Sequence, residues 1–411
     1  MTTIAELLKK ILTIKNELKE TINGLGGFAD NDFTKYNEYL IKFYIEGGRT
    51  NGNYIEKLEI PSYVTNISNY RFKLSKFKEV VVPSSVQVIN DGAFCYNSNL
   101  KKVTLNEGVM SIGNEVFSQC TNLEEINLPD SLSYMNNKCF DNCQKLKSIT
   151  LPSNLQGLGQ SCFNQCKSLT EVTFPKKIKN TGSYSFGWCS GLTTVTIPKT
   201  VESISNSTFT NCTSLKKVIF VEGEKEQNPF FPPFMMRGGR IEDNAFENCK
   251  SLTEITIPDD FENLSRRVFY QCSNLTGVTL SNKVINIGDE AFGNCLKLTE
   301  VTIPDSVKYI GNFCFFGCTS LTALTIPSGV IEINTRMFGN CTSLTTLNLS
   351  KNIKSIHDGI FFGCTQPIRI NYNGTRNEWI SIKREETDIP SGSKLVCTDG
   401  EYTLDRTLTP S

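Results

Sequence analysis

The side chains that could do chemistry in this sequence are sixteen cysteines and a single histidine, His357. A thiol beside a histidine base can act as a nucleophile, and thiols can also pair as disulfides or bind zinc. His357 and Cys364 are near enough in the sequence for such a nucleophilic pair to be conceivable. A single histidine excludes a multi-histidine metal site, and no Cys-x-x-Cys motif occurs.

Other motifs for catalysis or cofactor binding are missing from the sequence. We find no glycine-rich phosphate loop and no nucleophile elbow. Acidic residues such as Asp243, Asp289 and Glu290 recur at one turn, where we expect them to be solvated or to cap a turn. We therefore predict neither enzyme activity nor a cofactor.

Length and charge narrow the classes of function further. The chain has 411 residues with 42 basic and 42 acidic side chains, so its formal net charge is zero. A neutral chain is a poor electrostatic partner for nucleic acid or an anionic membrane. No run of about 18 apolar residues occurs, so we expect no membrane insertion. Lysines interrupt residues 1–22, which therefore do not resemble a secretory signal.

Most of the cysteines recur at a fixed period, which indicates that a repeated structural unit positions them. A Phe-x-x-Cys pair recurs every 23 residues, except for one step of 37 residues from Phe209 to Phe246. Phe94 is an earlier member, with Asn97 in the cysteine position. Such a period indicates stacked units that bury a shared core. The pairs are Phe117/Cys120, Phe140/Cys143, Phe163/Cys166, Phe186/Cys189, Phe209/Cys212, Phe246/Cys249, Phe269/Cys272, Phe292/Cys295, Phe315/Cys318, Phe338/Cys341 and Phe361/Cys364.

Each repeat predicts one turn of a solenoid. In a representative repeat, Val301 and Ile303 alternate with polar residues at strand spacing, and Pro304 ends the strand. The spacing of Phe315 and Cys318 suits one turn of 3₁₀- or α-helix. Because parallel strands stack about 4.8 Å apart, about 14 such rungs form a rod or arc roughly 65 Å long. We therefore expect one elongated solenoid instead of several globular domains.

The repeats resemble the BspA-like subclass of leucine-rich repeats. The resemblance is carried by the recurring motifs Cys-x-x-Leu-x-x-Val/Ile-x-Ile/Leu-Pro, Val-x-x-Ile-Gly and Ala/Cys-Phe-x-x-Cys, over residues 51–366. It implies an α/β repeat fold, a leucine-rich-repeat solenoid with parallel strands forming a sheet on one face. Members of this subclass are bacterial surface adhesins, protist surface proteins and phage-encoded proteins.

The repeat also changes the interpretation of the cysteines. Eleven of them hold one position, where small apolar groups can pack as a buried ladder. Adjacent rungs also lie within disulfide range, and this alternative stays open. Three more, Cys139, Cys162 and Cys314, act as small fillers in a second column, and Cys95 and Cys397 stand outside both. We favour free, buried thiols over disulfides or zinc.

A column of threonines is predicted to face outward. One side chain lies between the two inward residues of each strand, and it is most often threonine. Aligned hydroxyls could bind a regular ligand such as a glycan, although threonine also simply suits an exposed strand position. Adjacent positions change charge between repeats, from Lys102 to Glu125 for example. The candidate ligand-face residues are Thr256, Thr279, Thr302 and Thr325.

One insertion, at about residues 221–240, interrupts the period. It is rich in phenylalanine, methionine and proline, and apolar loops on rigid scaffolds commonly form interfaces. We expect it to contact another protein, or alternatively to fold back and cap its own solenoid. The candidate partner-binding residues are Phe230, Phe231, Phe234, Met235, Met236 and Arg237.

Residues 1–50 are predicted to form a helical anchor. Apolar heptad positions over residues 3–22 predict a helix, and isoleucine at both a and d favours a trimeric coiled coil. The alternative is a helix docked on its own first repeat. The pattern resembles the N-terminal segments of some phage tail or head-fibre proteins, where a short helix precedes a receptor-facing region. The oligomerisation candidates are Ile4, Leu7, Ile11, Ile14 and Leu18.

Residues 367–411 are predicted to form a cap and tail. Ile370 and Tyr372 continue the strand register of the repeats, and Trp379 can cover the open apolar end that a terminal repeat leaves. The sequence around Trp379 also resembles the terminal cap of BspA-like repeats.

These features predict a non-catalytic recognition or adhesion scaffold. The leading hypothesis is a virion-associated phage fibre or receptor-binding protein, a homotrimer through its N-terminal helix, that contacts a host surface protein or glycan. One alternative is a structural assembly protein that packs against neighbouring subunits. Another is a bacterial or protist adhesin, located at the cell surface or secreted.

Overall fold

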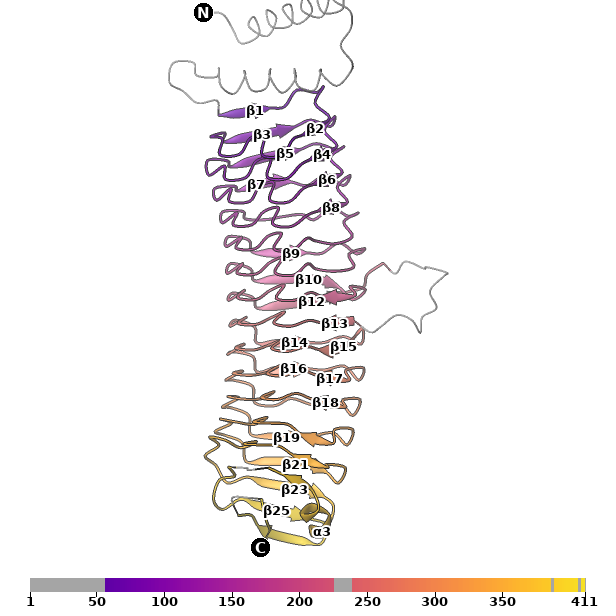
Figure 1. Cartoon of the computed structure of the whole chain (residues 1–411), viewed down its shortest axis with the longest axis vertical. Helices are drawn as coiled ribbons and strands as arrows, with labels where there is room; N and C mark the ends of the chain where they lie inside the picture. Colours follow the sequence, from indigo (N-terminus) through magenta and orange to yellow (C-terminus); the bar gives the residue numbers. More distant parts are fainter. Residues whose placement is uncertain (1–55, 225–238, 386–387, 406–407, 411) are drawn as a thin grey trace, which may run out of the picture. The chain divides into compact units, whose positions relative to one another are not determined.

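The computed structural model describes residues 56–224, 239–385, 388–405 and 408–410 (Figure 1). The chain divides into two units, Met1–Ile55 and Glu56–Ser411. All of the described residues belong to the second unit, which is a solenoid of short parallel strands. The solenoid predicted from the period is thus confirmed.

Most rungs contribute a strand to a first parallel ladder. Burial alternates along these strands: Val103 and Leu105 point into the core, and Lys102 and Thr104 face outward, as a period of two predicts. The final pairing, between the last two strands, is antiparallel. The strands are β1 (Lys57–Glu59), β3 (Glu79–Val82), β5 (Lys102–Leu105), β7 (Glu125–Asn127), β9 (Glu171–Thr173), β10 (Thr194–Pro198), β12 (Lys217–Val221), β14 (Glu254–Thr256), β16 (Gly277–Thr279), β19 (Ala323–Thr325), β21 (Thr346–Ser350), β23 (Arg369–Asn373), β25 (Lys394–Cys397) and β26 (Gly400–Thr403).

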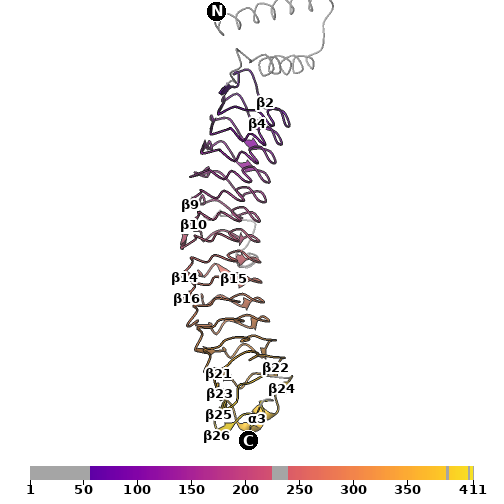
Figure 2. The same cartoon turned by 90° about the vertical axis from the view of Figure 1, so that its left-hand side faces the viewer.

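A second parallel ladder lies along another side of the rungs (Figure 2). It is built from the Val-x-x-Ile segment, so that Ile112 pairs with Met135 and Ile287 with Ile310. Its strands are β2 (Asn66–Ile67), β4 (Val88–Ile89), β6 (Ser111–Ile112), β8 (Tyr134–Met135), β11 (Ser203–Ile204), β13 (Gly239–Ile241), β15 (Phe261–Leu264), β17 (Asn286–Ile287), β18 (Tyr309–Ile310), β20 (Glu332–Ile333), β22 (Ser355–Ile356) and β24 (Lys383–Arg384).

The third side of each rung consists of consecutive turns, which we call the turn column. The N–H of Cys318 donates to the carbonyl of Phe315 at 3.1 Å, which is the bond expected from their spacing. The turn does not continue as a helix, because Gly317 has a left-handed φ of 72°. Within the described ranges the single α-helix is α3 (Arg376–Ile380), so the α component of the predicted repeat is confined to the cap.

Backbone hydrogen bonds also join the turns of successive rungs. The N–H of Phe117 donates to the carbonyl of Cys139 at 2.8 Å, and that of Phe140 donates to the carbonyl of Cys162 at 2.7 Å. The direction is the same from rung to rung. The neighbouring rung therefore satisfies backbone groups that would otherwise be buried without partners.

The core is made of columns of identical side chains. Phenylalanines stack from Phe72 to Phe361, with adjacent ring centroids 5.0–6.2 Å apart and interplanar angles of 4–21°. The repeat leucines and column cysteines fill the space beside them. Each fully buried phenylalanine contributes roughly 1.5–3 kcal/mol of transfer free energy.

The cap contains α3 and the side chains that support it. Thr375 and Glu378 form a capping box at the start of the helix. Trp379 is fully buried, donates from Nε1 to the carbonyl of Leu408 at 3.0 Å, and meets the Tyr372 ring edge-on. Trp379 therefore lies in an apolar interior, and its role as a cover for the end of the repeats stays a prediction.

Candidate binding face at the carboxyl-terminal rungs

The candidate threonines lie on the outward face of the first ladder. Thr256 pairs with Thr279, and Thr279 pairs with Thr302, so neighbouring hydroxyls are one rung apart. All three side chains are exposed, as is that of Thr325 in β19. The regular column predicted from the sequence is present, and its role in ligand binding stays a prediction.

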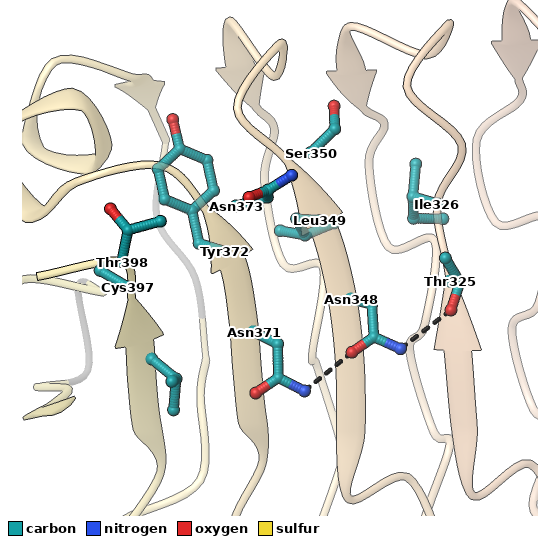
Figure 3. A pocket seen from close by; sticks show the side chains of 11 residues that line it. Thr325, Ile326, Asn348, Leu349, Ser350, Asn371, Tyr372, Asn373, Cys397 and Thr398 are labelled. Carbon is teal, nitrogen blue, oxygen red and sulfur yellow. Dashed lines mark hydrogen bonds between the residues drawn. The ribbon is translucent and has the colours of Figure 1, made fainter. Parts of the chain in front are cut away.

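After Thr325, asparagine replaces threonine in this outward column. Asn348 and Asn371 hold the same outward position in β21 and β23. The Nδ2 atom of Asn371 donates to Oδ1 of Asn348 at 2.8 Å, and Nδ2 of Asn348 donates to Oγ1 of Thr325 at 2.8 Å (Figure 3). These three side chains form an amide ladder with fixed orientation.

The amide ladder borders an open pocket of about 450 Å³ (Figure 3). Strands β19, β21, β23 and β25 supply most of its lining, so four successive rungs build it. None of the lining residues is acidic or basic, and most of the lining surface is apolar. The pocket therefore suits an uncharged ligand that combines apolar contacts with a few hydrogen bonds. The lining residues are Thr325, Ile326, Asn348, Leu349, Ser350, Asn371, Tyr372, Asn373, Val396, Cys397 and Thr398.

Sequence reasoning identified only part of this pocket. Thr325 is the one predicted ligand-face residue that lines it, whereas Thr256, Thr279 and Thr302 do not. The signal that could have located it is the change from threonine to asparagine in two consecutive repeats. Burial raises the pKa of Cys397 to about 11, so this thiol stays protonated at neutral pH and is a poor nucleophile.

The structure gives His357 and Cys364 different partners. The Nδ1 atom of His357 lies 3.3 Å from Glu385, and its Nε2 atom lies 3.9 Å from Glu332. The Cys364 thiol donates to the carbonyl of Phe338 at 3.2 Å, and burial raises its pKa to about 11. This geometry does not provide an activated nucleophile.

The cysteine columns are buried within the core. All sixteen cysteines are free thiols, and Cys364 is the least buried member of its column. Burial raises the pKa of Cys120, Cys189, Cys272 and Cys318 to about 12. In the part of the chain that the structure describes, no group of three or more histidine, cysteine or acidic side chains could hold a metal ion.

Two sets of predicted site residues lie outside the described residues. They are the anchor candidates Ile4, Leu7, Ile11, Ile14 and Leu18 and the insertion candidates Phe230, Phe231, Phe234, Met235, Met236 and Arg237. Described strands border the insertion, since β12 ends at Val221 and β13 begins at Gly239. Over the described ranges, no helix is long and apolar enough to cross a membrane.

Short parallel strands in two ladders, with inward columns of leucine and phenylalanine, define a leucine-rich-repeat solenoid. The chain belongs to the BspA type of these repeats, since the family model described as "BspA type Leucine rich repeat region (6 copies)" matches residues 50–147, 110–229 and 239–368. The family predicted from the repeat motifs is thus confirmed. A comparison with curated proteins finds no match.

Solved bacterial structures are similar to this chain. A leucine-rich repeat protein from Bacteroides ovatus is 26% identical, with 78% of this chain and 91% of that chain covered and a TM-score of 0.46. A leucine rich cell surface protein from Faecalibacterium prausnitzii is 24% identical, with coverages of 80% and 90% and a TM-score of 0.50. A leucine-rich repeat protein from Eubacterium ventriosum is 22% identical, with coverages of 85% and 87% and a TM-score of 0.49.

Proposed function

We propose that this protein is a non-catalytic recognition scaffold displayed at a bacterial cell surface, where it binds a protein partner through the first ladder. The observation that carries this proposal is the uncharged pocket beside Thr325, Asn348 and Asn371. Side-chain amides and hydroxyls supply both donors and acceptors, which match those of a peptide backbone. The hydrogen bonds between them hold the ladder in one orientation before binding.

Family membership is the basis for the proposed location. The repeat motifs resemble those of BspA-like proteins, whose bacterial members are surface adhesins. The Faecalibacterium prausnitzii protein with this fold is itself described as a cell surface protein. Antibody labelling of intact producing cells tests the location, and labelling that appears only after lysis would exclude it.

A binding assay tests the pocket. The full chain is titrated by biolayer interferometry over immobilised extracellular-matrix proteins and mucin. For a partner that binds, we expect Asn348→Ala/Asn371→Ala to weaken binding at least about tenfold, which corresponds to about 1.4 kcal/mol. Thr256→Ala is the matched control, because it alters the same outward column outside the pocket. Equal affinity of the double variant and the unaltered protein would remove the pocket from the proposal.

A glycan bound along Thr256, Thr279, Thr302 and Thr325 remains a second proposal for the same face. In that case Thr256→Ala weakens binding of an extended polysaccharide, whereas Asn348→Ala/Asn371→Ala weakens it less.

The virion role depends on the N-terminal anchor. For this role we propose a homotrimer formed through residues 3–22. The trimer would join the solenoid to a phage particle as a fibre or pack it against a virion neighbour. Light scattering on the full chain tests the trimer, and a monomer at micromolar concentration would contradict it.

A further inference from the structure

The outward face of the second ladder carries an exposed apolar patch over three successive rungs. Ile285 is 38% exposed, Tyr309 is 42% exposed and Ile331 is 41% exposed. Ile285 and Ile331 directly precede β17 and β20, and Tyr309 begins β18. Strands β15, β17 and β18 lie one below another along this side of the solenoid (Figure 1). We call these three residues the apolar patch.

The fold does not require isoleucine at the two outer positions of the patch. The residue directly before a second-ladder strand is polar in most rungs, as at Gln87, Ser133 and Lys308. Ile285 and Ile331 are exposed, so they contribute little to the core. Apolar side chains that cluster on a surface where the repeat accepts polar ones are typical of an interaction site.

The spacing of the two isoleucines fits a second copy of this chain. Ile285 and Ile331 hold the same repeat position two rungs apart, with Lys308 between them. A two-fold axis that lies in this face, along the rung of Tyr309, therefore brings Ile285 of one copy onto Ile331 of the other, and the reverse. Lys308 leaves this contact open, because its Nζ lies only 2.7 Å from where a Cβ of Gly329 would be, toward the corner of the next rung.

The charged residues of the outer rungs are complementary under the same axis. Glu262 lies two rungs before Tyr309, and Lys354 lies two rungs after it, both in the repeat position of the isoleucines. The axis therefore brings Glu262 of one copy onto Lys354 of the other. Asp259 and Lys351, at the corner beside the ladder, are related in the same way. The isoleucines alone determine the axis, so the charge match is an independent observation.

Backbone hydrogen bonds confirm that these residues form one column. The N–H of Ile285 donates to the carbonyl of Glu262 at 2.8 Å, and the N–H of Lys354 donates to the carbonyl of Ile331 at 2.8 Å. Within the described ranges, neither Glu262 nor Lys354 forms an ion pair in its own chain. Both charges are therefore available to a second copy.

Like charges limit the length of the contact. Arg240 and Lys383 hold the outward strand position three rungs before and three rungs after Tyr309, so the axis brings them together. The favourable contact covers the five rungs between them, a length of about 24 Å. An interface of this length is small, and a dimer that it holds is weak and sensitive to salt.

We propose that the apolar patch is a homodimer interface, which binds a second copy of this chain in the antiparallel orientation. Ile285 and Ile331 supply the apolar contact, and Glu262 with Lys354 determines the register. The interface lies on the second ladder, so each dimer carries two copies of the pocket on the first ladder.

Analytical ultracentrifugation of the full chain tests the dimer. We expect reversible doubling of the mass with a Kd on the order of 10–100 µM at low salt. The Kd should rise at least about threefold at about 0.5 M salt, where exposed charges are screened. Absence of concentration-dependent association up to about ten times the upper Kd would overturn the proposal.

Charge reversal tests the register. Glu262→Lys and Lys354→Glu each place like charges in both symmetry-related contacts, so each variant alone should dimerise at least about tenfold more weakly. In an equimolar mixture of the two variants, every contact of the mixed dimer joins opposite charges, and association should return. This recovery excludes misfolding as the cause of the loss. A mixture that associates no better than either variant alone would overturn the proposed register.

A matched pair of variants tests the apolar contact. Ile285→Gln introduces the residue type found at Gln87 in the same repeat position, so the fold should be retained. We expect at least about tenfold weaker dimerisation. Met110→Gln is the control, since Met110 is 46% exposed in the same repeat position but lies outside the five rungs. Its dimerisation should be unchanged, and equal effects of the two variants would contradict an interface at the apolar patch. Residues 3–22 are unaltered in all of these variants, so a trimer formed there would persist.

Discussion

At the scale of the residue, the cysteine column is explained by hydrogen bonding and size. The thiol of each column cysteine lies 3.1–3.3 Å from the carbonyl of the phenylalanine in the preceding rung. A valine would fill similar space but could not donate. Asn97, which holds the cysteine position in an early rung, donates to the carbonyls of Phe72 and Phe94 at 2.8 Å each. The position therefore selects a small donor.

Removing one column thiol should reduce stability. Cys272 is fully buried and donates to the carbonyl of Phe246 at 3.1 Å. Cys272→Ala loses this donor and leaves a small cavity, so we expect the free energy of unfolding to fall by about 1–2 kcal/mol. Urea titration followed by circular dichroism measures the change. An unaltered unfolding midpoint would show that the thiol packs without contributing a useful hydrogen bond.

Replacement of Asn97 by cysteine should be tolerated. The Oδ1 atom of this buried side chain has no hydrogen-bond partner, and an unsatisfied buried acceptor costs about 1–3 kcal/mol. Asn97→Cys removes that atom and keeps a donor for the carbonyl of Phe72. We therefore expect equal or greater stability in the same urea titration, and a loss above about 1 kcal/mol would contradict the donor explanation.

At the scale of the element, period-two patterning and the fixed repeat predict the first ladder well. The turn column was less predictable, because its left-handed residues include glutamate, lysine and arginine as well as asparagine. Only the bonds between rungs make this conformation favourable for such residues. The pocket escaped prediction for a related reason: Asn348 and Asn371 look like ordinary exposed strand residues until their register brings the amides together.

Two glycines of one repeat should respond oppositely to alanine. A Cβ at Gly288 would lie 2.6 Å from the carbonyl carbon of Ser265, so Gly288→Ala forces adjacent rungs apart and should cost about 1–3 kcal/mol. Gly277 is in β16 with open space around it, and Gly277→Ala should be neutral or stabilise by up to about 1 kcal/mol. Thermal unfolding of both variants provides the comparison. Equal effects would show that contact between rungs does not limit this turn.

At the scale of the whole molecule, equivalent side chains of successive rungs lie one above another. The charge, burial or hydrogen bonding of one repeat position therefore recurs along the axis of the solenoid. Opposite charges on adjacent rungs pair across the first ladder, as between Lys102 and Glu125 at 3.1 Å, although exposed pairs contribute little each. Buried thiols are different, because their protonation is coupled to folding. The column therefore links the stability of the entire solenoid to pH.

This coupling predicts cooperative unfolding in alkali. Burial holds the pKa of Cys120, Cys189 and Cys318 at about 12, whereas the ordinary value is 9.0. Above pH 9 the unfolded chain releases thiol protons that the folded chain retains, so the free energy of unfolding falls as pH rises toward 12. Each buried thiol contributes about 1.4 kcal/mol per pH unit in this window. We expect one steep loss of circular dichroism in this window. Below pH 9 these thiols are protonated in both states, so they do not lower the free energy of unfolding.

Thiol reactivity distinguishes this mechanism from general alkaline damage. A disulfide reagent should modify the column cysteines slowly at pH 8 and rapidly, in one phase, at the pH where the circular dichroism is lost, because the same unfolding exposes them all. Returning the unmodified protein to pH 8 should restore both signals. Modification that proceeds one cysteine at a time, while the circular dichroism persists, would mean that rungs open individually and that the solenoid does not share its proton linkage along the axis.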